Sequence, residues 1–383
     1  MQGDFHYYAT YCAAILAGFS HEESAEICYS DQFTDYCSAT FLSKIKAPEI
    51  AATTQLKLEM MDTRTDVIGL QNITRIWSSF HFLPGDLYAE VKGCKKYKNK
   101  YRLICNPNGD LLVDTVKLAK DKSLQAAGIA MHVLSDTWAH RYFAGTPSLV
   151  INNTNYHFYE IDGDEERKVS FQNNPVGKDD PEKSIYVGSL FVPNENSIMN
   201  LGHGRAGHLP DYSYIKYKYL PAWGGYEEII KDNPHDYYYA FCQMLYALEY
   251  YKGARDSFEK EKYAFDSAEK YEDRIRTIFA KRQLDSSEDW KEFGKELSGR
   301  DLEDFDAEKY QNEYISAEPE KKKDTFLGRY VEAAIAQKSM VTGRIYESGN
   351  KLAGYSKRLK EGKSGIIQDY FSLFTGIGRG DKK

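Results

Sequence analysis

The stretch His132-Val-Leu-Ser-Asp136-Thr-Trp-Ala-His140 lies in an apolar run whose spacing predicts a helix over about residues 115–143. Steps of four residues advance by about 40° around a helix, so His132, Asp136 and His140 would project from one stripe about 12 Å long. An unpaired carboxylate would be costly to bury on such a helix, and a bound cation would remove that cost. The stretch therefore predicts a buried helix that carries a metal site.

Helical spacing also precedes this stretch. Residues 4–17, 21–43 and 51–80 carry apolar residues at intervals of three and four. Ser20 and Glu23 form the pattern of a capping box in front of the second of these segments. Together the segments predict a mainly α fold, a bundle of several helices.

Two parts of the chain depart from helical spacing. The sequence Asn106-Pro-Asn-Gly109 separates two apolar runs, which predicts a hairpin over about residues 96–114 as a small β excursion. Residues 146–200 are rich in Asn, Asp, Gly and Pro, and they predict an irregular insertion. Its β-prone pieces are residues 156–161, 169–171 and 185–191.

These features divide the chain into two parts. Residues 1–225 would form a metal-binding catalytic core, and residues 226–383 would form a helical C-terminal region packed on that core. Within this region, the charged residues 256–323 fit either exposed helices or a mobile segment. Residues 376–383 are expected to be a disordered end.

Composition restricts the classes of function. The 383 residues are 42% hydrophobic, and no apolar stretch approaches the roughly 18 residues of a membrane span. The first residues lack the basic and apolar regions of a signal peptide, so we expect a cytoplasmic location. The net charge of −7 argues against a stable complex with nucleic acid. The six cysteines form no C-x-x-C pair, which favours buried thiols over disulfides or a zinc ribbon.

Six of the nine histidines fall into four short clusters, most with aspartates close by. Nitrogen and oxygen ligands without thiolate suit a catalytic site for zinc, with manganese or iron as alternatives. The clusters supply more ligands than one ion can use, so we expect two or three divalent ions. The candidate ligands are His6, Asp31 or Asp35, His81, His132, Asp136, His140, His203, His208 and Asp211.

Most clusters also have an interpretation without a metal. His6 could be an ordinary residue of a first helical turn, and His81 could be a hydrogen-bonded core histidine. Asp31 and Asp35 stand four residues apart, which fits a cation site or an exposed acidic face. The glycine-rich residues 202–211 could be an ordinary loop. The remaining histidines, His21, His157 and His235, are read as surface or capping residues.

Taken together, these residues resemble the superfamily of zinc-dependent phospholipase C and S1/P1 nucleases, and most closely an uncharacterised bacterial branch of it that begins Asp-Phe-His-Tyr-Tyr. Members are all-helical phosphodiesterases with a trinuclear metal cluster. The resemblance covers about residues 1–225. It implies that Asp35, or less favourably Asp31, binds a first ion with the residues His81, His132 and Asp136.

The resemblance also implies the other two ion positions. Asp136 would bridge to a second ion bound by His6 and the Met1 amine, where the family carries an N-terminal Trp. His140, His208 and Asp211 would bind the third ion, with His203 as an alternative to His208. This third position departs from the family pattern, because three residues separate Asp136 from His140 where five are usual. Two residues separate His208 from Asp211 where three are usual.

The function that follows is metal-dependent hydrolysis of a phosphodiester, with Asp35 and Asp136 as catalytic residues. Asp35 would take or steer the proton of the attacking water. The substrate would be a nucleotide, a single-stranded nucleic acid or a phospholipid head group. The alternative is a non-catalytic helical binding or scaffold protein stabilised by metal. An HD-type phosphohydrolase is a further alternative, but the adjacent His-Asp pair occurs only at His235-Asp236, outside the clusters.

Overall fold

The computed structural model describes residues 1–56, Glu59, and residues 67–90, 95–146, 149–152, 154–172, 179–187, 202–221 and 227–350. This part of the chain is mainly helical and carries a small sheet. The longer helices are α1 (Thr10–Leu16), α2 (His21–Phe33), α5 (Val67–Phe80), α6 (Lys95–Tyr101), α7 (Asp110–Ala119), α8 (Leu124–Ala139), α11 (Asn233–Lys252), α13 (Glu272–Ala280), α14 (Ser287–Ser298) and α16 (Phe326–Glu347).

Shorter helical segments connect them. They are η1 (Asp4–Ala9), α3 (Ala39–Lys44), η2 (Glu49–Ala51), α9 (Leu149–Asn152), η3 (Pro181–Lys183), α10 (Gly202–Ala206), η4 (Leu209–Asp211), α12 (Phe265–Ala268), η5 (Glu269–Tyr271), α15 (Gln311–Ser316) and η6 (Pro319–Asp324). In the described part of the chain, no helix is both long enough and apolar enough to cross a membrane.

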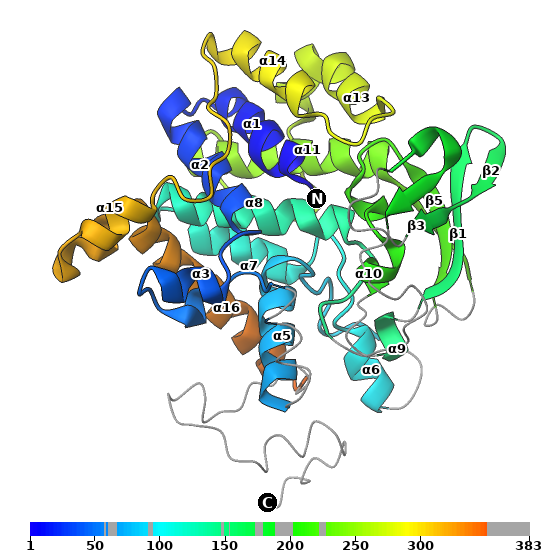
Figure 1. Ribbon diagram of the computed structural model, residues 1–383, viewed down its shortest axis with the longest axis horizontal. Coiled ribbons are helices and arrows are strands. Elements are labelled where there is room, and N and C mark those ends of the chain that lie inside the picture. Colours follow the sequence, from blue (N-terminus) through cyan, green and yellow to red (C-terminus); the bar gives the residue numbers. More distant parts are fainter. Residues whose placement is uncertain are drawn as a thin grey trace, which may run out of the picture.

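Helix α8 is the centre of the fold. It starts at the N-cap Ser123, whose side chain accepts a hydrogen bond from the Ala126 amide, and every residue from Ala127 to Ala139 is buried. Helices α2, α5, α7, α11 and α16 pack around it (Figure 1). Gly128 permits the contact with α2, because a Cβ there would lie 2.3 Å from the Ile27 carbonyl oxygen. A larger residue would push the two helices apart.

The β structure lies at one end of the bundle (Figure 1). Strands β1 (Thr154–Asp162), β2 (Glu165–Lys168), β5 (Lys216–Pro221) and β6 (Ile229–Asp232) form an antiparallel sheet in the order β2-β1-β5-β6. Strands β3 (Ser170–Gln172) and β4 (Ile185–Val187) form a separate parallel pair. The three β-prone pieces of the insertion therefore lie in or overlap strands. Within the described residues of the predicted irregular insertion, residues 154–172 and 185–187 are largely ordered as strands, because β1 pairs with β5, which follows the insertion in the sequence.

One buried cluster joins the two halves of the sequence. Phe5 and Leu134 belong to it together with Phe241, Trp290 and Tyr330. The charged residues 256–323 are ordered helices and turns, since Trp290, Phe293 and Tyr314 are buried in this cluster. Of the C-terminal helices, α11 and α16 pack on α8, whereas α14 packs on α1 and η1. A division into domains at residue 225 stays a prediction, and residues 376–383 lie outside the described residues.

The predicted hairpin over residues 96–114 is wrong. Asn106 to Asn108 form a turn, but Gly109 then caps α7, whose buried residues recur at helical intervals. Gly109 is required at this position, because a Cβ would lie 2.2 Å from the Gly85 carbonyl oxygen. The apolar run after the turn therefore belongs to a helix, and Ile104 and Cys105 before the turn pair with Ala144 and Pro84 instead.

Three predicted helices are shorter than expected. The helix over 115–143 is split at Lys120–Ser123 into α7 and α8, where Asp121 has a positive φ of 59°. The helix over 21–43 is interrupted between α2 and α3, and Ser38 caps α3. Of the described residues in the segment 51–80, residues 52–56 are not helical and α5 forms the last part; residues 57, 58 and 60–66 lie outside the described residues. The capping box of Ser20 and Glu23 is confirmed, as are five buried free thiols; Cys94 lies outside the described residues.

Candidate metal centre

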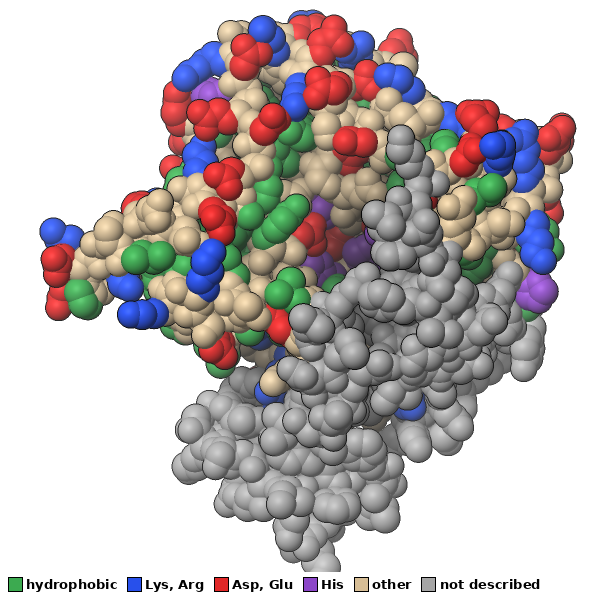
Figure 2. All heavy atoms as spheres, viewed as in Figure 1, with side chains coloured by type: hydrophobic (Ala, Val, Ile, Leu, Met, Phe, Trp, Pro, Cys, Tyr) green, Lys and Arg blue, Asp and Glu red, His purple; other side chains and the backbone are tan. Residues whose placement is uncertain are grey.

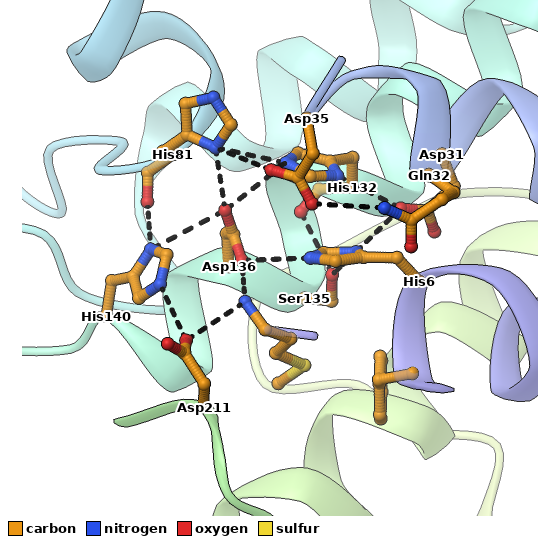
Figure 3. Close-up of polar contacts among 12 residues, drawn as sticks. His6, Asp31, Gln32, Asp35, His81, His132, Ser135, Asp136, His140 and Asp211 are labelled. Carbon is orange, nitrogen blue, oxygen red and sulfur yellow. Dashed lines mark hydrogen bonds and ion pairs between the residues drawn. The ribbon is translucent and has the colours of Figure 1, made fainter. Parts of the chain in front are cut away.

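Asp136 lies in the middle of the candidate site and divides its two oxygens between two groups of nitrogen atoms (Figure 3). Its Oδ2 lies 3.1 Å from His81 Nδ1 and 3.3 Å from His132 Nε2. Its Oδ1 lies 2.5 Å from the Met1 amine and 3.3 Å from His6 Nε2. This carboxylate is buried, and its position fits a ligand shared by two ions.

The first group has the dimensions of a tetrahedral site. His81 Nδ1 and His132 Nε2 lie 3.2 Å apart, and Asp35 Oδ1 lies 3.7 and 3.8 Å from them. With Asp136 Oδ2, these atoms outline a tetrahedron whose known edges measure 3.1–3.8 Å. Ligands at about 2.0–2.1 Å from a tetrahedral zinc ion lie about 3.3 Å from one another. The four atoms therefore fit one ion with little movement.

The second group is positioned by an unusual helix. Residues Asp4–Ala9 form a π-helix, a rare element that is frequent at functional sites. It carries His6, whose Nε2 is buried, faces Asp136 and has no hydrogen-bond partner among the described residues. The Met1 amine lies between Asp136 and Asp211, 3.7 Å from Oδ1 of the latter. These atoms offer two nitrogen ligands and one oxygen ligand.

The third group lies at the C-terminal end of α8. His140 caps this helix, and its backbone amide still bonds to the Asp136 carbonyl, which keeps the two side chains in line. His140 Nε2 lies 3.5 Å and His203 Nε2 lies 3.3 Å from Asp211 Oδ1. His208 instead faces the other oxygen, Oδ2, at 3.2 Å, and its side chain is 43% exposed. The arrangement favours His203 over His208 as the partner of His140 in this third group.

The described residues contain three sets of side-chain atoms that could hold an ion, each set lying within 4.8 Å. Two of the sets belong to the first and third groups, and the remaining set joins His6 of the second group to Asp35 and His132 of the first. The sets are His81, His132 and Asp136; His6, Asp35 and His132; and His140, His203 and Asp211. In the face shown in Figure 2, histidine and carboxylate side chains line the bottom of a central hollow. Asp35 is the most open of these carboxylates, with a third of its side chain exposed.

Each of four histidines is held by one ring nitrogen and directs the other into the site. His6 Nδ1 and His132 Nδ1 both contact the Asp31 carboxylate, at 2.7 and 3.1 Å. Metal-binding histidines commonly donate their second N–H to a carboxylate or a carbonyl in this way. The two others bond to backbone carbonyls: His81 Nε2 to Thr53 at 3.0 Å, and His140 Nδ1 to His81 at 2.6 Å.

The hydrogen bonds to carbonyl and carboxylate oxygens fix the tautomers of His81 and His132. A carbonyl oxygen only accepts, so His81 must carry its proton on Nε2 and present a lone pair from Nδ1. His132 donates to Asp31 through Nδ1 and presents a lone pair from Nε2. Two nitrogen lone pairs and two carboxylates, Asp35 and Asp136, thus converge without a donor between them. Only a cation or additional protons can stabilise that arrangement.

Protons fill this role when no cation is bound. Burial opposes the charged form of His132, but Asp136 and Asp35 outweigh it and raise the pKa of the ring to about 10. The pKa of the Met1 amine is likewise raised to about 10, against burial, by Asp136 and Asp211. Burial dominates at His140 and lowers its pKa to about 4. A metal ion would replace the protons on His132 and on the amine.

The two central carboxylates are held in their charged form. Burial alone would raise the pKa of Asp136, but His140, the Met1 amine and His132 hold it well below its usual range. His203 and His140 do the same for Asp211, again against burial. Both groups are therefore available as anionic ligands at neutral pH.

Some residues of the site escaped the sequence analysis. Tyr330 of α16 donates to Thr34 Oγ1 at 3.1 Å, and its hydroxyl lies 3.3 Å from Thr53 Oγ1. Thr34 precedes Asp35, and the Thr53 carbonyl holds His81. No local motif marks these residues, because their contacts span almost 300 positions. Of the histidines read as peripheral, His157 and His235 are exposed, and His21 is half-buried and bonds to Tyr11.

A sequence profile of a family of unknown function (DUF6765) matches residues 1–345. The match covers most of the chain and all the residues of the metal centre, so the chain belongs to DUF6765. No curated protein matches the chain, and no solved structure matches it.

Proposed function

We propose that this protein is a metal-dependent hydrolase that cleaves phosphodiester bonds with two or three divalent ions. The observation that supports it best is the convergence of His81 Nδ1, His132 Nε2, Asp35 and Asp136 as four acceptor atoms at tetrahedral spacing. Zinc fits this donor set and geometry, with manganese or iron as alternatives.

The ligands of the proposed ions follow from the three groups. Asp35, His81, His132 and Asp136 would bind the first ion, and Asp136 would be shared with a second ion at His6 and the Met1 amine. His140, His203 and Asp211 would bind the third. A carboxylate shared by two ions, as proposed for Asp136, supports a fold and chemistry similar to those of zinc-dependent phospholipase C and S1/P1 nucleases.

Bound ions would supply Lewis-acid activation of water and of the phosphoryl oxygens. The chain itself supplies the groups that hold and move protons. Asp35 is both close to the first position and open to solvent, so it can accept the proton of the attacking water. Asp136 is buried, and it keeps the ions in place. The substrate would be a nucleotide, a single-stranded nucleic acid or a phospholipid head group.

Metal analysis of protein purified without a His-tag tests the first half of this proposal. We expect two or three transition-metal ions per chain, and loss of at least one ion in His132→Ala. Asp136→Asn should lose more metal than His140→Ala, because it removes a ligand shared by two ions. His235→Ala is the matched control, since His235 is half exposed and lies outside the centre. Fewer than one ion per chain would contradict the proposal.

Hydrolysis assays test the second half. We expect cleavage of bis-p-nitrophenyl phosphate, short single-stranded DNA or RNA, or phosphatidylcholine, with loss of activity in chelator and recovery in zinc or manganese. Asp35→Asn should lower kcat at least 100-fold, within the range found for general bases. If fully metallated protein cleaves none of these compounds, a non-catalytic, metal-stabilised binding or scaffold protein becomes the better description.

A further inference from the structure

Asp31 is a buried carboxylate that contacts one histidine of each of two proposed ion positions from the side opposite to the ligand nitrogen. Its Oδ1 lies 2.7 Å from His6 Nδ1 and 3.1 Å from His132 Nδ1. The opposite nitrogen of each ring, Nε2, faces Asp136 at 3.3 Å. Asp31 therefore lies behind both rings, on the side away from the ions (Figure 3).

The other contacts of Asp31 keep it in that position. Its Oδ2 accepts a hydrogen bond from Thr10 Oγ1 at 2.7 Å, and its side chain is fully buried. The rings of His6 and His132 stack with their centroids 4.0 Å apart and their planes 20° apart. Ser135 Oγ lies 3.4 Å from His6 Nδ1, further away than Asp31. One oxygen atom thus accepts a hydrogen bond from His132 Nδ1 and also contacts Nδ1 of the stacked His6 ring.

We propose that Asp31 is a positioning residue that couples the two ion positions, so that filling one favours filling the other. This inference rests on the proposed metal centre. An ion on His6 Nε2 would require the ring proton to sit on Nδ1, which lies 2.7 Å from Asp31 Oδ1. The carboxylate is then fixed in the orientation that His132 needs to donate its own Nδ1 proton and present Nε2. Such a coupling acts equally in both directions.

Asp31 differs in this respect from Asp35, which we assign as a ligand of the first ion only. Loss of a group that orients metal ligands typically lowers metal affinity 10–100-fold. Asp31→Ala should therefore weaken zinc binding by that factor at both positions, whereas Asp35→Ala should weaken it mainly at the first. The contrast separates a residue acting through two histidines from a ligand of one ion.

The test is a zinc titration of histidine-labelled protein, in which the ring-nitrogen NMR signals of His6 and His81 report the two positions separately. In the unaltered chain both signals should change over the same range of zinc concentration. In Asp31→Ala both midpoints should move to higher zinc, and the Nδ1–H forms of His6 and His132 should become less populated. Asp31→Asn keeps an acceptor oxygen and should shift both midpoints less.

One control variant and three outcomes separate a failure of the coupling from a failure of the proposed metal centre. Ser30→Ala alters the neighbouring buried residue, whose hydroxyl bonds to the Glu26 carbonyl, and should leave both midpoints unchanged. If Asp31→Ala moves one midpoint or neither, the coupling is refuted while the metal centre stands. If the unaltered chain shows no zinc-dependent change at His6 or His81, the proposed function itself fails. Should the alanine variant not fold, Asp31→Asn decides, since it retains the shape of the side chain.

Discussion

His132 Nε2 lies 3.2 Å from His81 Nδ1, although each ring already donates through its other nitrogen, to Asp31 and to the Thr53 carbonyl respectively. Two lone pairs at this separation repel unless a positive charge lies between or beside them. The same two nitrogens face Asp35 and Asp136. The centre must therefore hold either protons or a metal cation. Experiments can measure directly which of the two is bound.

Zinc uptake at pH 7 should release protons. Without metal, the pKa values of His132 and of the Met1 amine are both raised to about 10, so both groups are protonated at pH 7. Coordination needs the lone pairs, so up to two protons leave, and the apparent affinity should rise with pH below about 10. Calorimetry in buffers of different ionisation enthalpy measures the number of protons released when zinc binds. His132→Ala should release one proton fewer, and a release of zero would contradict the assignment.

The third ion position should depend on His203 and not on His208. His203 Nε2 shares Asp211 Oδ1 with His140, whereas His208 faces Oδ2 and is 43% exposed. We expect His203→Ala to lower the metal content by about one ion and His208→Ala to leave it unchanged. Metal analysis of the two variants side by side checks this. If His208→Ala loses the ion and His203→Ala keeps it, His208 would be the ligand, as the family resemblance implies.

A few residues added before Met1 should remove one ligand. The Met1 nitrogen is buried and lies 2.5 Å from Asp136, and an extension would turn this amine into an amide that cannot bind metal in the same way. We expect about one ion fewer per chain and lower phosphodiesterase activity. Removing the extension with a protease should restore both. Equal metal content and activity with and without the extension would exclude the amine as a ligand.

Tyr330→Phe should weaken the first ion position from a distance. The tyrosine hydroxyl bonds to Thr34 and Thr53, which lie next to Asp35 and behind His81. Its loss should lower the free energy of unfolding by about 1 kcal/mol and reduce zinc affinity at this position by less than about tenfold. Chemical denaturation and zinc titration measure the two effects.

Tyr217→Phe provides the control for that variant. The Tyr217 hydroxyl is buried and has no hydrogen-bond partner among the described residues, so its removal should be neutral or slightly stabilising. An identical loss of zinc affinity in both variants would show that Tyr330 acts through general stability and not through His81.

Local spacing predicted the parts of the structure that depend on neighbouring residues. The four-residue spacing of His132, Asp136 and His140 holds because one turn of α8 aligns side chains at that interval. The capping box of Ser20 and Glu23 is local in the same sense. The hairpin over residues 96–114 was predicted wrongly, because the run after the turn packs as a helix and the residues before it pair with Pro84 and Ala144 from other parts of the chain.

The sequence by itself therefore determined a buried histidine- and aspartate-bearing helix within a mainly helical fold. Tertiary structure decided which side of each ring faces the centre, and it separated Asp35, which faces His81 and His132 across the centre, from Asp31, which lies behind the His6 and His132 rings. It also favoured His203 over His208 and brought Tyr330 to Thr34 across 296 positions. The physical reason is that ligand roles depend on ring tautomers and on contacts across packed helices, and neither is encoded in spacing along the chain.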